Sequence, residues 1–192
     1  MSTQLGFYII PGRCVQCQAC KVACKSTNEV ELGPQWRKVV ENWSGEYPKP
    51  RNLTMSYSCM HCEKPVCLSV CPAKAISKRA SDGVVVVDQK ACIGCRSCEK
   101  ACPFGAPQFG ASGKMQKCEF CLPQLAQGKQ PACVATCPAE ALGFGSIDEL
   151  KKLAAEKGGI RLPGSTEPAF FIIPSNMGGK PQEYVQIFFP KV

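Results

Sequence analysis

The sequence predicts a loop-rich α+β fold of short strands and short helices, followed by one longer helix and a tail. Three observations predict it. The sixteen cysteines of this 192-residue chain fall into four groups of four. The segments between the groups are short apolar runs bounded by turn-forming residues. Only the segment after the last group has the periodicity of a longer helix. Each cysteine group is therefore expected on a loop between small elements.

The predicted strands lead into these loops. Leu5 to Ile10 and Leu53 to Ser58 are strand candidates that precede the first and second cysteine groups. Ile76 to Arg79 and Val84 to Asp88 flank an Ala-Ser-Asp-Gly turn and predict a hairpin. This hairpin would deliver the chain from the second group to the third.

The first and third cysteine groups share one spacing, with gaps of two, two and three residues. They are Cys14, Cys17, Cys20 and Cys24, and Cys92, Cys95, Cys98 and Cys102. This is the spacing with which bacterial ferredoxins bind 4Fe-4S clusters. Three sulfur ligands must come from one short loop that wraps the cluster with its N–H groups, and two intervening residues achieve this.

The second and fourth groups lengthen only the middle gap, to four and eleven residues. They are Cys59, Cys62, Cys67 and Cys71, and Cys118, Cys121, Cys133 and Cys137. We expect the last cysteine of each group at the start of a helix, pointing toward a different cluster. A proline follows it everywhere except in the first group, where Lys25 stands. The sequence thus predicts four 4Fe-4S clusters, with all sixteen cysteines as iron ligands.

A helix and a tail follow the last group. Ser146 and Glu149 form a capping box, and apolar residues continue at helical spacing until Gly158. The tail contains two strand-like apolar runs, Ala169 to Ile173 and Tyr184 to Phe189. It is expected to strap the core, with docking on a partner as the alternative.

The net charge is less informative than it first looks. The formal value of +8 counts every thiol as neutral, whereas four thiolate-bound clusters would add about −8. The loaded protein would be close to neutral, so nucleic acid is not an expected partner. No apolar run approaches the roughly 18 residues that span a bilayer, and residues 1–13 lack the features of a signal peptide. We therefore expect no membrane span and no export signal.

Two other uses of cysteine compete with clusters. Disulfides between C-x-x-C cysteines would close very small loops and hold little together. A zinc-binding structural protein is the stronger alternative, because four-cysteine zinc sites also use C-x-x-C pairs. Zinc ribbons, however, separate two such pairs by about 15 to 20 residues. Metal content would discriminate between zinc and clusters.

The chain lacks the residues of an independent enzyme. Its one histidine, His61, lies inside the second cysteine group, where it is expected to bond a cluster sulfur, contact a partner or simply pack. No glycine-rich phosphate loop, nucleophile motif or acid pair stands out. Trp36, Trp43 and Tyr47, between the first two groups, are expected in the core.

Longer stretches around the cysteines resemble a known family. They are Cys-Met-His-Cys-Glu at 59–63, Asp-Gly-Val-Val-Val-Val-Asp at 82–88, Cys-Ile-Gly-Cys-Arg at 92–96, Cys-Pro-Phe-Gly-Ala-Pro-Gln at 102–108 and Phe-Gly-Ser-Ile-Asp-Glu-Leu at 144–150. The chain resembles the four-cluster iron-sulfur (beta) subunits of the dimethyl sulfoxide reductase family of molybdopterin oxidoreductases. Within that family it looks most like the electron-transfer subunits of dimethyl sulfoxide reductases.

The resemblance implies a fold of two nested bacterial-ferredoxin-like modules in residues 1–145. The inner module would span about 53–110 and the outer about 1–52 with 111–145, while 146–192 would form a C-terminal helix and docking tail. It also implies four ligand sets. They are Cys14, Cys17, Cys20 and Cys137; Cys24, Cys118, Cys121 and Cys133; Cys59, Cys62, Cys67 and Cys102; and Cys71, Cys92, Cys95 and Cys98.

The function implied by the resemblance is electron transfer without catalysis in the chain itself. The clusters would relay electrons between a quinol-linked membrane anchor subunit and a large molybdenum or tungsten pterin subunit of an anaerobic respiratory oxidoreductase. An electron-transfer subunit of a hydrogenase or formate dehydrogenase complex is the alternative. Such a chain is peripheral to the cytoplasmic membrane through its partners, either cytoplasmic or exported with a signal-bearing partner.

Overall fold

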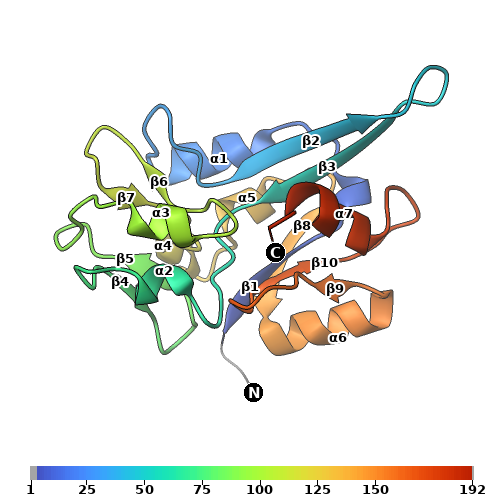
Figure 1. Ribbon diagram of the computed structural model, residues 1–192. Coiled ribbons are helices and arrows are strands. Elements are labelled where there is room, and N and C mark those ends of the chain that lie inside the picture. The colour runs from blue at the N-terminus through green and yellow to red at the C-terminus, as the bar shows by residue number, and fades with distance from the viewer. Residues whose placement is uncertain (1–3, 192) are drawn as a thin grey trace.

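The computed structural model describes residues 4–191, so the predicted domain limits at residues 1 and 192 lie outside it. The described part divides visibly into two halves (Figure 1). One half holds a four-stranded sheet with a long helix against it, and the other consists of loops, short hairpins and short helices. The predicted architecture of short strands and helices is confirmed in this coarse form.

The sheet joins strands from both ends of the chain. Its order is β8 (Leu142–Ser146), β1 (Leu5–Ile9), β10 (Phe170–Ile172), β9 (Ile160–Arg161). β1 runs antiparallel to β8 and parallel to β10, so that Phe7 lies between two other phenylalanines in the register. β10 is buried along its whole length, as its uninterrupted apolar sequence predicts. The predicted strands near residues 5 and 169 are confirmed.

Helix α6 (Ile147–Lys157) follows β8 directly and confirms the predicted cap. Ser146 Oγ accepts a hydrogen bond from the Glu149 N–H, and the Glu149 carboxylate accepts one from the Ser146 N–H. The helix ends at Gly158, which adopts a left-handed conformation with φ 66°. Its apolar face packs on the sheet through Leu150 and Ala154.

The second apolar run of the tail is a helix, so the strand predicted at 184–189 is wrong. Helix α7 (Pro181–Phe188) begins with proline at its first position, where the fixed φ and missing N–H favour a helix. Tyr184 and Phe188, four residues apart, place their rings on one face of α7. Glu183 of α7 pairs with Arg51, at the start of strand β3 (Arg51–Tyr57), through contacts of 2.5 and 2.8 Å. The tail therefore packs on its own chain, and its docking role stays a prediction.

Three two-stranded hairpins complete the strands. β4 (Ile76–Lys78) pairs with β5 (Val85–Val87) as predicted, and β6 (Gln108–Phe109) with β7 (Met115–Gln116). β2 (Lys38–Ser44) pairs with β3 (Arg51–Tyr57), of which only β3 was expected.

The β2–β3 hairpin projects from the body of the molecule (Figure 1). The core position expected for two of its aromatic residues is therefore wrong, because Trp43 is 66% and Tyr47 95% exposed. Trp36, which precedes the hairpin, is half-buried and its indole N–H donates to Gln116 Oε1 at 2.9 Å.

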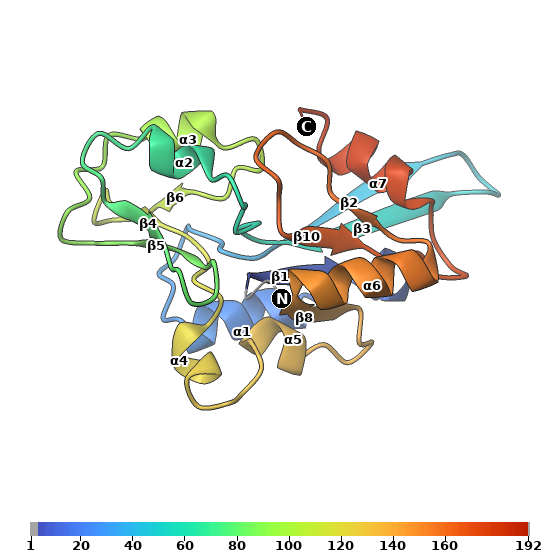
Figure 2. The same ribbon diagram turned by 90° about the horizontal axis from the view of Figure 1, so that it is seen from below.

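The remaining helices are short and accompany the cysteine loops. They are η1 (Pro11–Arg13), α1 (Ala19–Thr27), α2 (Val66–Ser69), α3 (Ser97–Ala101), α4 (Leu122–Leu125) and α5 (Ala132–Ala135). Seen from below, α2 and α3 lie together on one side, and α1, α4 and α5 gather on the other (Figure 2). α1 packs against α5, and α2 against α3.

Candidate cluster sites lined by cysteine

Each cysteine group begins with a loop whose backbone turns in the same way. The second residue between the first two cysteines has a positive φ in all four groups: Gln16 (60°), His61 (41°), Gly94 (70°) and Phe120 (61°). This left-handed conformation directs successive N–H groups toward the inside of the loop, as in anion-binding nests. Only Gly94 indicates it in the sequence, because glycine alone adopts it without strain.

The third and fourth cysteines of each group are joined by a helical turn. The third is the second residue of its helix: Cys20 in α1, Cys67 in α2, Cys98 in α3 and Cys133 in α5. The fourth follows one turn later, so the expectation that it begins a helix is wrong. In three groups the following proline ends the helix there, because a residue before proline disfavours helical geometry. α1 has no such proline and continues to Thr27.

Strand pairing brings distant groups together. β1 leads into the first group and β8 follows the fourth, and Ile9 lies opposite Leu142 in their register. Beyond this pair, the Ile10 N–H donates to the Ala141 carbonyl at 2.8 Å. Cys14 and Cys137 thereby line one cavity. In the same way the β4–β5 hairpin returns the chain from the second group to the third.

Three sets of four cysteines each line a small cavity, of about 20 Å3 in each case. We name them site 1 (Cys14, Cys17, Cys20, Cys137), site 3 (Cys59, Cys62, Cys67, Cys102) and site 4 (Cys71, Cys92, Cys95, Cys98). In each, three cysteines of one group are joined by a single cysteine of another. The similar volumes indicate that the three cavities suit groups of the same size.

The other four cysteines also converge, and we name them site 2 (Cys24, Cys118, Cys121, Cys133). All four are buried. The Asn28 amide nitrogen lies 3.8 Å from Cys24 Sγ and 3.7 Å from Cys121 Sγ. Burial raises the pKa of Cys24, and the sulfurs of Cys118 and Cys133 raise it further. The structure thus brings the cysteines together in four groups of four, and their assignment as iron ligands stays a prediction.

The geometry of these sites suits a cluster better than a single ion. A zinc ion draws its sulfur ligands to about 2.3 Å, which leaves no cavity between them. At sites 1, 3 and 4 the sulfurs surround open space, and no three potential ligands in residues 4–191 stand close enough to hold one ion. All-sulfur donor sets on nest-forming loops fit 4Fe-4S clusters, which take four thiolates and accept N–H bonds on their sulfides.

The electrostatics of the cysteine sites also favour a bound group with positive charge. Burial raises the pKa of Cys62 to about 12, with the neighbouring Cys59 and Cys102 adding to the effect. Burial likewise raises the pKa of Cys98 to about 11. Converging thiolates repel one another in a poorly solvated site, so these thiols would stay protonated without a bound cation. Bound iron removes the conflict, because a coordinating thiol is deprotonated outright.

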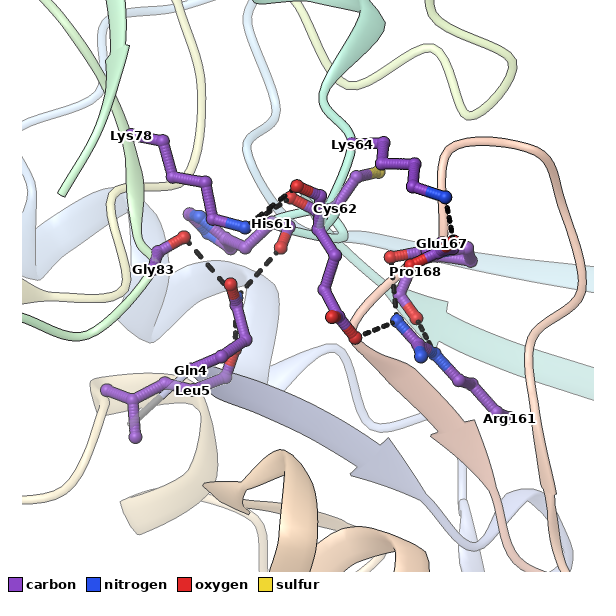
Figure 3. Close-up of polar contacts among 11 residues, drawn as sticks. Gln4, Leu5, His61, Cys62, Lys64, Lys78, Gly83, Arg161, Glu167 and Pro168 are labelled. Atoms are coloured by element: carbon purple, nitrogen blue, oxygen red, sulfur yellow. Dashed lines mark hydrogen bonds and ion pairs between the residues drawn. The ribbon is translucent and has the colours of Figure 1, made fainter. Parts of the chain in front are cut away.

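The second cysteine loop is held by residues from distant segments (Figure 3). The Gln4 side chain donates to the His61 carbonyl at 3.0 Å, and Lys78 Nζ donates to the carbonyls of Cys62 and Glu63 at 3.3 and 2.9 Å. Arg161 pairs with the Glu63 carboxylate at 2.6 Å. These contacts tie site 3 to the central sheet.

His61 packs in the core, as one of its predicted alternatives had it, and its bond to a cluster sulfur or contact with a partner stays a prediction. It is fully buried, its Nδ1 accepts the Val85 N–H at 3.1 Å, and its ring meets the Phe120 ring edge-on. Burial lowers its pKa well below the usual value, and the nearby Lys117 and Lys78 lower it further. The ring is therefore neutral and links the second loop to β5. No bond from Nε2 is present within the described residues.

Two buried cations were missed at the level of sequence. Arg37 and Lys117 are each 1% exposed. Lys117 Nζ donates to the carbonyls of Val85 and Cys118. Arg37 donates to two serine hydroxyls of β3 and its end, Ser56 and Ser58. Nothing in the local sequence separates these residues from solvated surface cations, although Lys117 directly precedes a cysteine.

Comparison with known proteins points to the same kind of cofactor. The 4Fe-4S dicluster domain family matches residues 51–147, which include the second, third and fourth cysteine groups. The protein is 44% identical over 161 residues to the B subunit of the anaerobic dimethyl sulfoxide reductase of Escherichia coli, covering 79% of this chain and 78% of the relative. It is 37% identical over 194 residues to the Haemophilus influenzae subunit of the same name, covering 96% and 92%.

A relative with a different name is also similar. The "Formate dehydrogenase iron-sulfur subunit" of Wolinella succinogenes is 37% identical over 174 residues, covering 79% of this chain and 86% of the relative. The 4Fe-4S match and the sixteen cysteines support four 4Fe-4S clusters as the cofactors, and structural zinc is set aside. No helix within residues 4–191 is long and apolar enough to cross a membrane.

Proposed function

Since the chain belongs to the iron-sulfur subunits of the anaerobic dimethyl sulfoxide reductase family, we propose that it relays electrons through four clusters and catalyses no bond-making reaction itself. The observation that carries the proposal is the convergence of the cysteines in four sites, with an exposed cysteine at site 1 and another at site 4. When bound, the clusters supply one-electron chemistry. The chain holds them, shields them from water and surrounds them with charge.

The proposed ligands are the four sets defined above, and the helical turns support their order. Cys20 and Cys24 lie on α1, and Cys133 and Cys137 on and beside α5, so sites 1 and 2 are joined twice. Sites 3 and 4 are joined in the same way through α2 and α3. Between the two pairs, Cys59 of site 3 lies near enough to Cys118 of site 2 to raise its pKa, after the larger effect of burial.

The packing also supports the nested modules. Groups one and four contribute α1 and α5, which pack together, while groups two and three contribute α2 and α3, which form the other packed pair. We therefore assign the inner module to about 53–110 and the outer to about 1–52 with 111–145. The remaining segment, 146–192, is less separate than its sequence suggests, because β10 pairs with β1.

Sites 1 and 4, at the ends of the proposed succession, are open, whereas site 2 is closed. Cys17 of site 1 and Cys95 of site 4 are exposed, whereas the four cysteines of site 2 are buried. An exposed apolar side chain stands near each open cysteine, Val15 at one end and Ile93 at the other. Electrons would enter at one end and leave at the other, where partner subunits can approach, and site 2 would be kept from solvent.

The proposed partners are a large molybdenum or tungsten pterin catalytic subunit and a quinol-linked membrane anchor subunit. The complex would be an anaerobic respiratory oxidoreductase at the cytoplasmic membrane, on the cytoplasmic side or exported with a signal-bearing partner. The named relatives support a reductase of the dimethyl sulfoxide type. The formate dehydrogenase relative supports the second candidate, a subunit of a formate-oxidising complex. The partner sets the direction of electron flow in both cases.

The proposal is tested by anaerobic purification followed by iron, sulfide and zinc analysis. We expect about sixteen iron and sixteen sulfide per chain, with interacting electron paramagnetic resonance (EPR) signals in the reduced protein. About four zinc and no sulfide, persisting after cluster reconstitution, would refute electron transfer. Co-purification of a large pterin-containing protein, followed by assay of dimethyl sulfoxide reduction and formate oxidation, discriminates between the two candidates.

A further inference from the structure

Arg37 is a buried cation whose direct contacts are all neutral. Its side chain is 1% exposed. One terminal nitrogen lies 3.3 Å from Ser56 Oγ and the other 3.1 Å from Ser58 Oγ. The guanidinium also stands 5.0 Å from the centre of the Phe7 ring. Within residues 4–191 no carboxylate pairs with Arg37, and its Nε has no hydrogen-bond partner.

A charge in this position needs a nearby anion. Arginine keeps its proton in proteins, so it cannot escape the desolvation penalty by becoming neutral. Well-packed apolar residues often replace buried ions without loss of stability, so hydrogen bonds to two serines do not by themselves account for an arginine here. A bound anionic group beside the guanidinium would account for it.

The groups that face Arg37 electrostatically are cysteine sulfurs. Burial lowers the Arg37 pKa, but the sulfurs of Cys133, Cys118, Cys20 and Cys24 together raise it above its usual value. Three of these four cysteines belong to site 2, and only Cys20 belongs to site 1. Ser56, which accepts from Arg37, lies 3.5 Å from Cys20 Sγ of site 1. Arg37 therefore stands between site 1 and site 2, the site that is most completely buried.

The charge of a cluster site matches this cation. Four thiolates and an oxidised 4Fe-4S core carry about −2, and one further electron makes the site about −3. Water, which would screen that charge at the open ends, is kept from site 2 by burial. A fixed positive charge beside it stabilises the reduced form more than the oxidised form.

We propose that Arg37 is the counter-charge of site 2 and raises the reduction potential there, with a smaller effect at site 1. The inference deepens the proposed function and rests on its ligand set for site 2. One electron enters the site from its neighbour in the relay and no proton accompanies it, because Arg37 stays protonated throughout. The two serines and Phe7 hold the guanidinium in place without neutralising it.

The experiment is an anaerobic redox titration of the cluster-loaded protein, followed by EPR, for wild type, Arg37→Gln, Arg37→Lys and Arg51→Gln. Arg51 is a matched control, because its substitution removes the same charge from the same hairpin at an exposed ion pair. The signal of site 2 is assigned as the one altered by Cys121→Ser.

At a fixed solution potential, we expect Arg37→Gln to lower the reduced-to-oxidised ratio of site 2 at least tenfold. This corresponds to a fall of about 59 mV in the midpoint potential of site 2. Arg37→Lys should retain most of the wild-type potential, and Arg51→Gln should not change it. A fully loaded Arg37→Gln protein with an unchanged site 2 overturns the inference, as does an equal shift at all four sites. A wild-type protein without clusters would instead overturn the proposed function.

A second pair of variants applies where Arg37→Gln does not retain its iron. Ser58→Asp would place a carboxylate beside the intact guanidinium and neutralise it, while Ser58→Ala removes only the hydroxyl. We expect a lower site 2 potential in Ser58→Asp than in Ser58→Ala. Equal site 2 potentials in these two loaded variants overturn the inference.

Discussion

Cys20 and Cys24 stand one turn apart on helix α1, yet they face different sites. Cys20 lines the cavity shared with Cys14, Cys17 and Cys137, whereas Cys24 lies among Cys118, Cys121 and Cys133. One turn of helix rises about 6 Å over four residues. A rigid turn thus sets the spacing of two neighbouring sites, which is the geometry that a relay requires.

Loss of an exposed and a buried cysteine should have different consequences. Cys95→Ser removes an exposed proposed ligand of site 4, so we expect site 4 to lose about one to four irons while the other sites stay loaded. Cys121→Ser removes a buried proposed ligand from site 2 and leaves unpaired thiols in the core. It should also lower the yield of folded protein.

Iron analysis, EPR and the recovery of soluble protein measure both effects. The exchange of one thiolate for a hydroxyl is the same in the two variants, so each controls for the other. Equal yields and equal iron loss would contradict the order of burial proposed for the sites.

Arg161 and its contacts form a clamp on the second cysteine loop. This clamp should control how fast site 3 loses iron. Arg161 donates to the carbonyls of Glu167 and Pro168 at 2.8 Å and pairs with Glu63. Arg161→Gln removes a charged donor, and hydrogen bonds to charged groups contribute about 1.5–3 kcal/mol each when well shielded. We expect site 3 to release iron to a chelator several-fold faster than in the wild type.

The rate of bleaching in excess chelator provides the measurement, with EPR to identify the site that is lost. Arg79→Gln is a suitable control, because Arg79 forms a local surface pair with Asp82. Identical rates in wild type and Arg161→Gln would mean that the clamp does not limit access to site 3.

The capping box should contribute measurably to helix α6. Ser146→Ala removes the acceptor for the Glu149 N–H, and loss of such a cap costs about 1 kcal/mol. Hydrogen exchange of the α6 amides should become roughly fivefold faster if these amides open locally. Ser81→Ala, in an exposed turn, is the matched control and should leave α6 unchanged.

The attachment of α7 should weaken in acid. The hydrogen bond from Arg51 lowers the pKa of Glu183 below 4.5. A carboxyl whose pKa is lower in the folded protein contributes stability above its unfolded pKa, and that contribution is lost as the pH falls through the folded pKa. Protection of α7 in pulsed hydrogen exchange should therefore fall in wild type as the pH drops below about 4.5.

Glu183→Gln tests the cause. It cannot form the ion pair, so its α7 should already be less protected at neutral pH and should lose the acid-dependent step. A step of the same size in Glu183→Gln would assign the acid response to another group.

The sequence alone determined the candidate cysteine ligands, the number of cluster sites and the local elements beside them. Cysteines two or three residues apart stay together whatever the rest of the chain does, so spacing is sufficient evidence for a shared site. The α6 cap and the β4–β5 hairpin are likewise encoded by neighbours in the chain, and both were predicted.

Tertiary structure decided what depends on distant residues. Cys137 lines a cavity with Cys14 because β1 and β8 pair, which no local spacing reveals. The run from Tyr184 to Phe189 has the composition of a strand, but it forms a helix because one face packs on β3. Arg37 looks like any surface cation until the hairpin and Phe7 enclose it. Burial and long-range pairing arise only from the folded chain, and they determine which charge stands beside which site.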